Sequence, residues 1–98
     1  MRTIDWVDGA IRLIDQTRLP DELVVLHITG LEPLIEAIAR LAVRGAPALG
    51  VAGGLGVAML AAANLDEAVV RAGAARLRAA RPTAVNLAWG VDRALARL

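Results

Sequence analysis

The chain has 98 residues, of which 57% are hydrophobic and 21% charged. This length fits one small domain, and the composition is too apolar for a disordered segment. The net charge of +1 argues against an electrostatic nucleic-acid footprint. The absence of cysteine excludes disulfides, thiolate metal sites and a cysteine nucleophile within the chain, and the single histidine, His27, cannot form a metal cluster. We therefore expect no metal and no cofactor.

Two features bear on location. The start, Met1 to Asp5, lacks the apolar run of a signal peptide, so we expect a cytoplasmic protein. Residues 45 to 65 carry no charge and are numerous enough to span a bilayer. Because most of them are Ala and Gly, with few large side chains to drive insertion, we favour a buried helix and expect no membrane contact.

The first part of the chain is expected to be β structure. Ile4 to Val7 forms a short strand, and Asp8-Gly9 is a strong two-residue hairpin signal. Ala10 to Asp15 then forms a second strand, and Thr17 to Asp21 a largely polar turn. Leu23 to Ile28, rich in branched residues, is predicted as a third strand. Together they predict a small antiparallel meander.

From Thr29 onward the hydrophobic period becomes helical. Thr29 and Glu32 have the spacing of a capping box, and Pro33 falls within the first turn, where its missing N–H is tolerated. The first helix is expected to run to about Val43. The residues on its apolar face are Leu31, Leu34, Ile35, Ile38, Leu41 and Ala42.

A second helix is expected from near Pro47 to about Ala63. Each glycine within it costs roughly 1 kcal/mol relative to alanine, so the glycines need a reason. Gly50, Gly53 and Gly54 lie on one side, which favours close packing against another helix. Close approach to a ligand or a second subunit is the alternative.

Two further helices complete the chain. Asn64 and Glu67 have the spacing of a helix cap, and Arg81-Pro82 ends the third helix. Thr83 or Arg81 is expected to cap a fourth helix that continues to Leu98. Because no capping glycine follows, we expect the chain to be truncated there. The predicted fold is α+β, one domain over residues 1–98, with a β meander (1–28) followed by a four-helix bundle (29–98).

Two corners of this fold suit an anion. Arg44, Gly45 and Ala46 precede or open the second helix, and Arg81 precedes the fourth. Helix starts present free N–H groups and partial positive charge, and arginine adds a planar, permanently charged fork. An arginine at such a junction is also often a surface residue or a structural ion pair, so spacing alone leaves both interpretations open.

Other polar and aromatic residues are read as structural. His27 in an alternating strand is expected to be half-buried or at the surface. Asp15-Gln16 at a strand end and Asp92-Arg93 on a helix are interpreted as turn and surface residues. Trp6 and Trp89 are assigned to core packing rather than to stacking on a ligand.

Three sequence strings nevertheless carry a resemblance. Val43 to Gly50 is similar to the segment V-R-G-A-P-A-I-G of methylthioribose-1-phosphate isomerases, and Ala80 to Leu87 to their A-R-P-T-A-V-N-L. Asp15 to Pro20 resembles their early L-D-Q-x-x-L-P. The strings occur in the expected order and are spread over residues 15 to 87 of the chain. Leu55 departs from the pattern, because the family often has a tyrosine there.

The resemblance implies a two-domain, homodimeric enzyme of methionine salvage, of which this is the N-terminal domain. A Rossmann-like C-terminal domain would follow and hold the catalytic cysteine and aspartate, so no catalytic residue is expected in this chain. The implied reaction converts the aldose 5-methylthioribose 1-phosphate to the ketose 5-methylthioribulose 1-phosphate. The implied substrate contacts are Arg44, Gly45, Ala46 and Arg81.

Three alternatives share much of this pattern. One is a regulatory subunit like those of translation initiation factor 2B, which acts through protein interactions. Another is a related isomerase acting on ribose 1,5-bisphosphate. The third is a structural fragment without a ligand.

Overall fold

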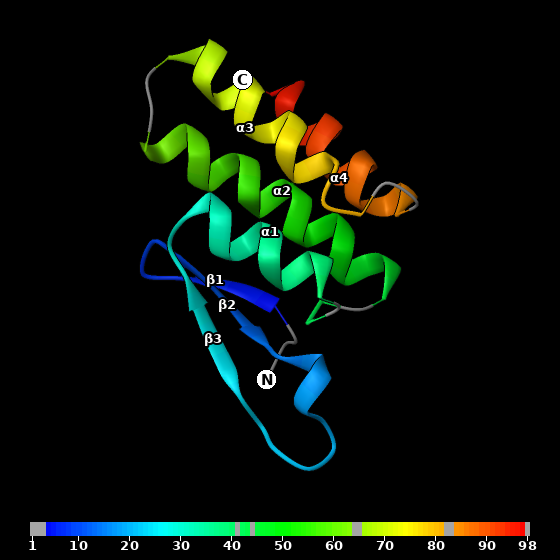
Figure 1. Ribbon diagram of the computed structural model, residues 1–98. Coiled ribbons are helices and arrows are strands. Elements are labelled where there is room, and N and C mark those ends of the chain that lie inside the picture. The colour runs from blue at the N-terminus through cyan, green and yellow to red at the C-terminus, as the bar shows by residue number, and fades with distance from the viewer. Residues whose placement is uncertain (1–3, 41, 44, 64–65, 82–83, 98) are drawn as a thin grey trace.

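A small sheet and four helices pack around one apolar core in the computed structural model (Figure 1), which describes residues 4–40, 42–43, 45–63, 66–81 and 84–97. The α+β prediction is therefore confirmed. The helix α2 (Ala46–Ala63) contacts the sheet on one side and the other helices elsewhere. The largest fully buried side chains come from both layers: Ile11, Leu13, Leu34, Ile38, Leu77, Leu87, Val57 and Val91.

The sheet is the predicted meander. Strands β1 (Ile4–Val7), β2 (Ala10–Ile14) and β3 (Val25–Ile28) pair antiparallel in the order β1-β2-β3. Asp8 and Gly9 both have positive φ, 51° and 79°, which is the backbone of the hairpin turn that Asp-Gly favours.

Two strand boundaries differ from prediction. The second strand ends at Ile14 because Asp15 instead caps a short 3-10 helix, η1 (Gln16–Arg18). The third strand begins at Val25 rather than Leu23, whose side chain is largely exposed. The Leu19–Pro20 peptide bond in the intervening turn is cis.

The four predicted helices are present, and α2 has the predicted bounds to within one residue, but the starts of the other three differ from prediction. The first helix, α1 (Leu31–Ala39), begins after Gly30, which makes no side-chain cap bond, so the Thr29 capping box is wrong. In α3 (Glu67–Arg78) the cap is Asp66, whose carboxylate accepts from the Ala68 N–H. The helix α4 (Val85–Leu95) begins after Ala84, so neither Thr83 nor Arg81 is its cap.

The first helix also ends earlier than expected, at Ala39 rather than near Val43. Arg40 leaves helical geometry at φ −90°, ψ 12°. The Ala42 N–H then bonds to the Ala37 carbonyl, which closes the helix end. Residues 40 to 45 therefore connect α1 to α2.

Of the three glycines of α2 that were predicted to pack against another helix, Gly53 does so, whereas a Cβ at Gly50 or Gly54 would meet its nearest neighbour at an ordinary contact distance, 3.5 or 3.9 Å. A Cβ at Gly53 would lie 2.7 Å from the Leu87 carbonyl oxygen, and one at Gly90 would overlap the backbone of Gly50. Gly50 in turn faces the Asn86 carbonyl. Gly50 meets Asn86, and Gly53, later in α2, meets Leu87 and Val91, later in α4. The two helices therefore run parallel, with their backbones close together.

Among the described residues, α2 is a helix long and apolar enough to cross a membrane, with a mean hydropathy of 1.7 over 18 residues. In the fold it contacts α1, α3, α4, β1 and β2. Its composition and this central placement favour the interpretation as a core helix.

Candidate anion-binding site

The parallel packing of α2 and α4 brings both helix starts to the same end of the molecule (Figure 1). Ala46 is one turn before Gly50, and Val85 is one residue before Asn86, so both starts lie close to the crossing point. Each helix presents the positive end of its dipole and N–H groups without partners inside the helix. Two such ends side by side favour an anion between or near them.

Gly45 and Ala46 open the first of these helices and are both exposed. The Gly45 carbonyl accepts the N–H of Leu49 at 3.0 Å, which is the first bond of the helix. Gly45 has a φ of +90°, whereas nothing lies within 4 Å of the position where its Cβ would be. Backbone conformation, rather than close packing, therefore explains this glycine.

Arg81 lies between the end of α3 and the start of α4 and is half-buried. Its carbonyl accepts the N–H of Ala84 at 2.9 Å, which ties it to the helix start. Its guanidinium makes no hydrogen bond or ion pair with another residue that the structure describes. The second predicted arginine, Arg44, lies outside the described residues.

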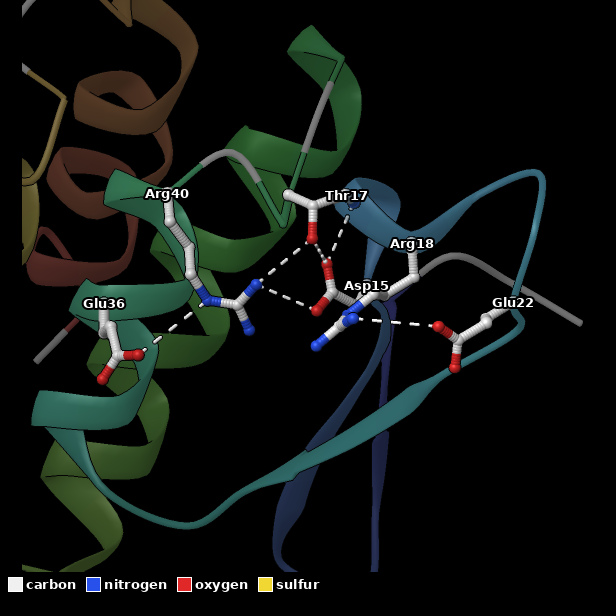
Figure 2. A network of polar contacts seen from close by, with 6 residues as sticks. All are labelled: Asp15, Thr17, Arg18, Glu22, Glu36 and Arg40. Atoms are coloured by element: carbon white, nitrogen blue, oxygen red, sulfur yellow. Dashed lines mark hydrogen bonds and ion pairs between the residues drawn. The ribbon is translucent and has the colours of Figure 1, made fainter.

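A polar network around the buried carboxylate of Asp15 lies beside the connection between α1 and α2 (Figure 2). The Asp15 carboxylate accepts from the backbone N–H of Thr17 at 3.0 Å and from its hydroxyl at 2.5 Å. Its second oxygen accepts from Arg40 Nη1 at 2.9 Å. Asp15 is 2% exposed, so its interpretation as a surface turn residue is wrong.

The electrostatics of this network favour the charged carboxylate. The hydrogen bond from the Thr17 hydroxyl lowers the pKa of Asp15 most strongly, and burial opposes this. The hydrogen bonds from the Arg40 guanidinium and from the Thr17 backbone N–H lower the pKa further. The net result is a pKa below the ordinary value. Asp15 is therefore a stable anion that organises its neighbours.

The remaining candidates have structural or surface positions. His27 is exposed on β3, in line with its interpretation. Asp92 forms an exposed ion pair with Arg78 at 3.2 Å. Trp6 and Trp89 are 37% and 58% exposed, so their assignment to the core is wrong. Arg93 lies 5.0 Å from the centre of the Trp89 ring.

No protein-family model matches the chain. A putative methylthioribose-1-phosphate isomerase from Methanothermobacter thermautotrophicus is 47% identical over 95 residues, covering 97% of this chain and 30% of the relative. A crystal structure of 5-methylthioribose 1-phosphate isomerase from Pyrococcus horikoshii superposes with a TM-score of 0.84 at 36% identity, over 94% of this chain and 28% of that one.

The chain belongs to the superfamily of methylthioribose-1-phosphate isomerases and initiation factor 2B subunits. The second branch is represented by a structure described as translation initiation factor eIF-2B, subunit delta, from A. fulgidus. It superposes with a TM-score of 0.91 at 46% identity and covers 98% of this chain and 30% of that one. The chain spans 28 to 30% of the length of these three relatives.

The packing of α2 against α4 thus places the starts of these two helices close together. What residue patterns missed is the Asp15 network. The string from Asp15 to Pro20 was one of the three that carried the family resemblance. It contains no local pattern that points to Arg40, which is 25 residues away from Asp15.

Proposed function

We propose that this domain supplies part of the phosphate site of an aldose-ketose isomerase that converts 5-methylthioribose 1-phosphate to 5-methylthioribulose 1-phosphate. The observation that carries the proposal is the shared end of α2 and α4, with the guanidinium of Arg81 uncommitted among described residues. Its proposed contacts are Arg44, Gly45, Ala46 and Arg81. The relatives named as isomerases support this choice of substrate.

The chemistry explains why a phosphate clamp matters. The reaction moves hydrogen from C2 to C1 of the sugar, so it is redox-neutral overall. The phosphate on the anomeric oxygen blocks simple ring opening, and the enzyme must open the ring without losing that group. Arginine forks and helix N–H groups that hold the phosphate would fix the sugar relative to the reacting groups. Those groups belong to the second domain that the resemblance implies.

The biological setting belongs to the same proposal. We place the enzyme in methionine salvage in the cytoplasm, as a homodimer acting on a sugar phosphate, without nucleic-acid or membrane partners. Exposed apolar side chains on this domain, among them Val85 and Trp89, are consistent with a surface covered by further protein. Light scattering on the complete protein tests the dimer directly.

The regulatory alternative rests on the A. fulgidus structure, whose description names an initiation factor subunit. A regulatory subunit would use the same fold for protein contacts and would turn over no sugar phosphate. A ribose-1,5-bisphosphate isomerase would use the same two corners for a different substrate.

The test is a turnover assay on the complete protein that carries this domain. We expect conversion of 5-methylthioribose 1-phosphate to the ketose, with ribose 1,5-bisphosphate a poor substrate. Residues 1–98 alone are expected to give no turnover above a blank. A preference for ribose 1,5-bisphosphate would instead support a ribose-1,5-bisphosphate isomerase. If neither sugar were turned over, the result would favour a regulatory subunit.

A further inference from the structure

The Asp15 network joins two segments that are distant in sequence. Asp15 follows β2, and its carboxylate is fully paired by Thr17 and Arg40. Its backbone N–H also bonds to the Val24 carbonyl at 2.8 Å, which anchors the carboxylate to the sheet. The backbone of Asp15 is therefore fixed beside the sheet independently of the contact between its carboxylate and Arg40.

On the helix side, the network holds the connection from α1 to α2. Arg40 is the C-cap of α1 and the first residue of that connection. The N–H of Gln16, next to Asp15, donates to the Ala42 carbonyl at 2.9 Å. Ala42 and Val43 are 0% and 3% exposed, so the connection is also packed into the core. These contacts end two residues before Gly45.

We infer that Asp15 is a positioning residue, which acts through Arg40 and through the Gln16–Ala42 bond to fix the connection that carries Gly45 and Ala46. The inference rests on the proposed function, because those amides are the proposed phosphate contacts. In general, paired strands form a rigid scaffold, and the connections between elements depend on contacts with that scaffold for their position.

The charge distribution supports a positioning role for Arg40. Its guanidinium spans the Asp15 carboxylate at 2.9 Å and the Glu36 carboxylate at 3.9 Å (Figure 2). The Asp15 side chain is 3% exposed, whereas that of Glu36 is 78% exposed, so the Asp15 bond is the stronger restraint. Removing the guanidinium frees the helix end and leaves a buried anion with one partner fewer.

The first experiment is steady-state kinetics of the complete protein with 5-methylthioribose 1-phosphate. Arg40→Ala should raise KM roughly tenfold and change kcat by less than about twofold, because a displaced binding segment weakens ground and transition state alike. Arg40→Lys, which keeps the charge, should recover most of the loss. The matched control is Arg18→Ala, since Arg18 lies in η1 and pairs only with the exposed Glu22, at 3.7 Å, among the described residues.

A second readout separates this inference from the proposed function. Hydrogen exchange, followed by mass spectrometry, should be faster over residues 40–49 in Arg40→Ala but not in Arg18→Ala, with the sheet unchanged in both. If the wild type turned over no substrate, the proposed function would fail and exchange alone would decide the positioning role. If Arg40→Ala does not fold, Arg40→Gln is measured in the same way.

Three results would overturn the inference. One is an unchanged KM in Arg40→Ala, another is unchanged exchange over residues 40–49, and the third is a loss of stability over the whole domain that Arg40→Lys does not repair. The last result would make the network a general element of the core.

Discussion

Asp15 is the buried charged residue among those that the structure describes, and its environment explains why it stays charged. Three hydrogen bonds outweigh the cost of removing the carboxylate from water. A carboxylate held in this way ties the free energy of unfolding to pH.

The first prediction concerns acid stability. Because the pKa of Asp15 is lower in the folded chain than its ordinary value of 3.8, its contribution is fully present above that value and is lost as pH falls through the folded pKa. Asp15→Asn should lower the free energy of unfolding near neutral pH by roughly 1.5 to 3 kcal/mol, the value of hydrogen bonds to a charged group. The difference should shrink in strong acid.

Urea unfolding of wild type and variant across that pH range checks this prediction. Glu22→Gln, at an exposed position, is the control and should follow the wild type. A difference between wild type and Asp15→Asn that does not change with pH would refute the role assigned to the charge.

The sequence could predict some of the residues of the candidate site, but not the role of Asp15. Arg81 and Gly45 stand at helix junctions that the sequence itself marks through Pro82 and Pro47. Asp15 has no such mark, because its decisive partner Arg40 comes from another element and only the tertiary fold brings them together. An aspartate after a strand is usually a turn residue, and here it is also a buried anchor.

At the level of elements, the contact between α2 and α4 decides where the candidate site lies. Gly53 and Gly90 let the two backbones approach more closely than side chains would permit. This contact sets the two helix starts side by side. The glycine spacing in α2 was therefore an accurate signal for packing at Gly53, although it did not identify the partner helix.

The second prediction tests that contact. Gly90→Ala should destabilise the fold by roughly 1 to 3 kcal/mol, because the new methyl overlaps the Gly50 backbone and this overpacking exceeds the gain of about 1 kcal/mol in helix propensity. Thermal unfolding measures it. Gly54→Ala is the matched control: its nearest neighbour, the Gly90 carbonyl oxygen, would lie 3.9 Å away, so it should be neutral or slightly stabilising. Equal melting temperatures for the two variants would contradict the account.

Helix starts were the least predictable feature of the elements. Gly30 and Ala84 precede helices without a side-chain cap bond. In each of these helices a leucine of the first turns is fully buried, Leu34 in α1 and Leu87 in α4. We infer that this packing sets the helix starts, and local capping patterns in the sequence do not predict it. Asp66, by contrast, caps α3 by a local bond and lay two residues beyond the predicted cap.

For the whole molecule, the distribution of apolar surface matters most. Large hydrophobic side chains are exposed on several elements, with Val85 at 77%, Leu23 at 67% and Trp89 at 58%. Val85 and Trp89 are four residues apart on α4 and so share one helix face. The hydrophobic residues that make up 57% of the chain therefore lie partly on the exposed surface and not only in the core.

The third prediction follows from that surface. The isolated 98-residue chain should fold and bind an apolar fluorescent dye, and acrylamide should quench the fluorescence of Trp89 readily. Trp89→Arg should reduce dye binding without lowering the melting temperature. A monomer with a sharp unfolding transition and no dye binding would argue against a surface that other protein covers.

Arg44 and Arg81 are proposed as joint contacts of the substrate phosphate. The most direct test is kcat/KM of Arg44→Ala and Arg81→Ala in the complete protein. Each substitution should cost about ten- to a hundredfold, or roughly 1.5 to 3 kcal/mol, as expected for one charge-assisted contact. Melting temperatures should stay near that of the wild type, and the exposed Arg97→Ala should leave both quantities unchanged. Near-wild-type kcat/KM in both variants would contradict the account, and loss of activity with an equal loss of stability would assign the two arginines to the fold instead.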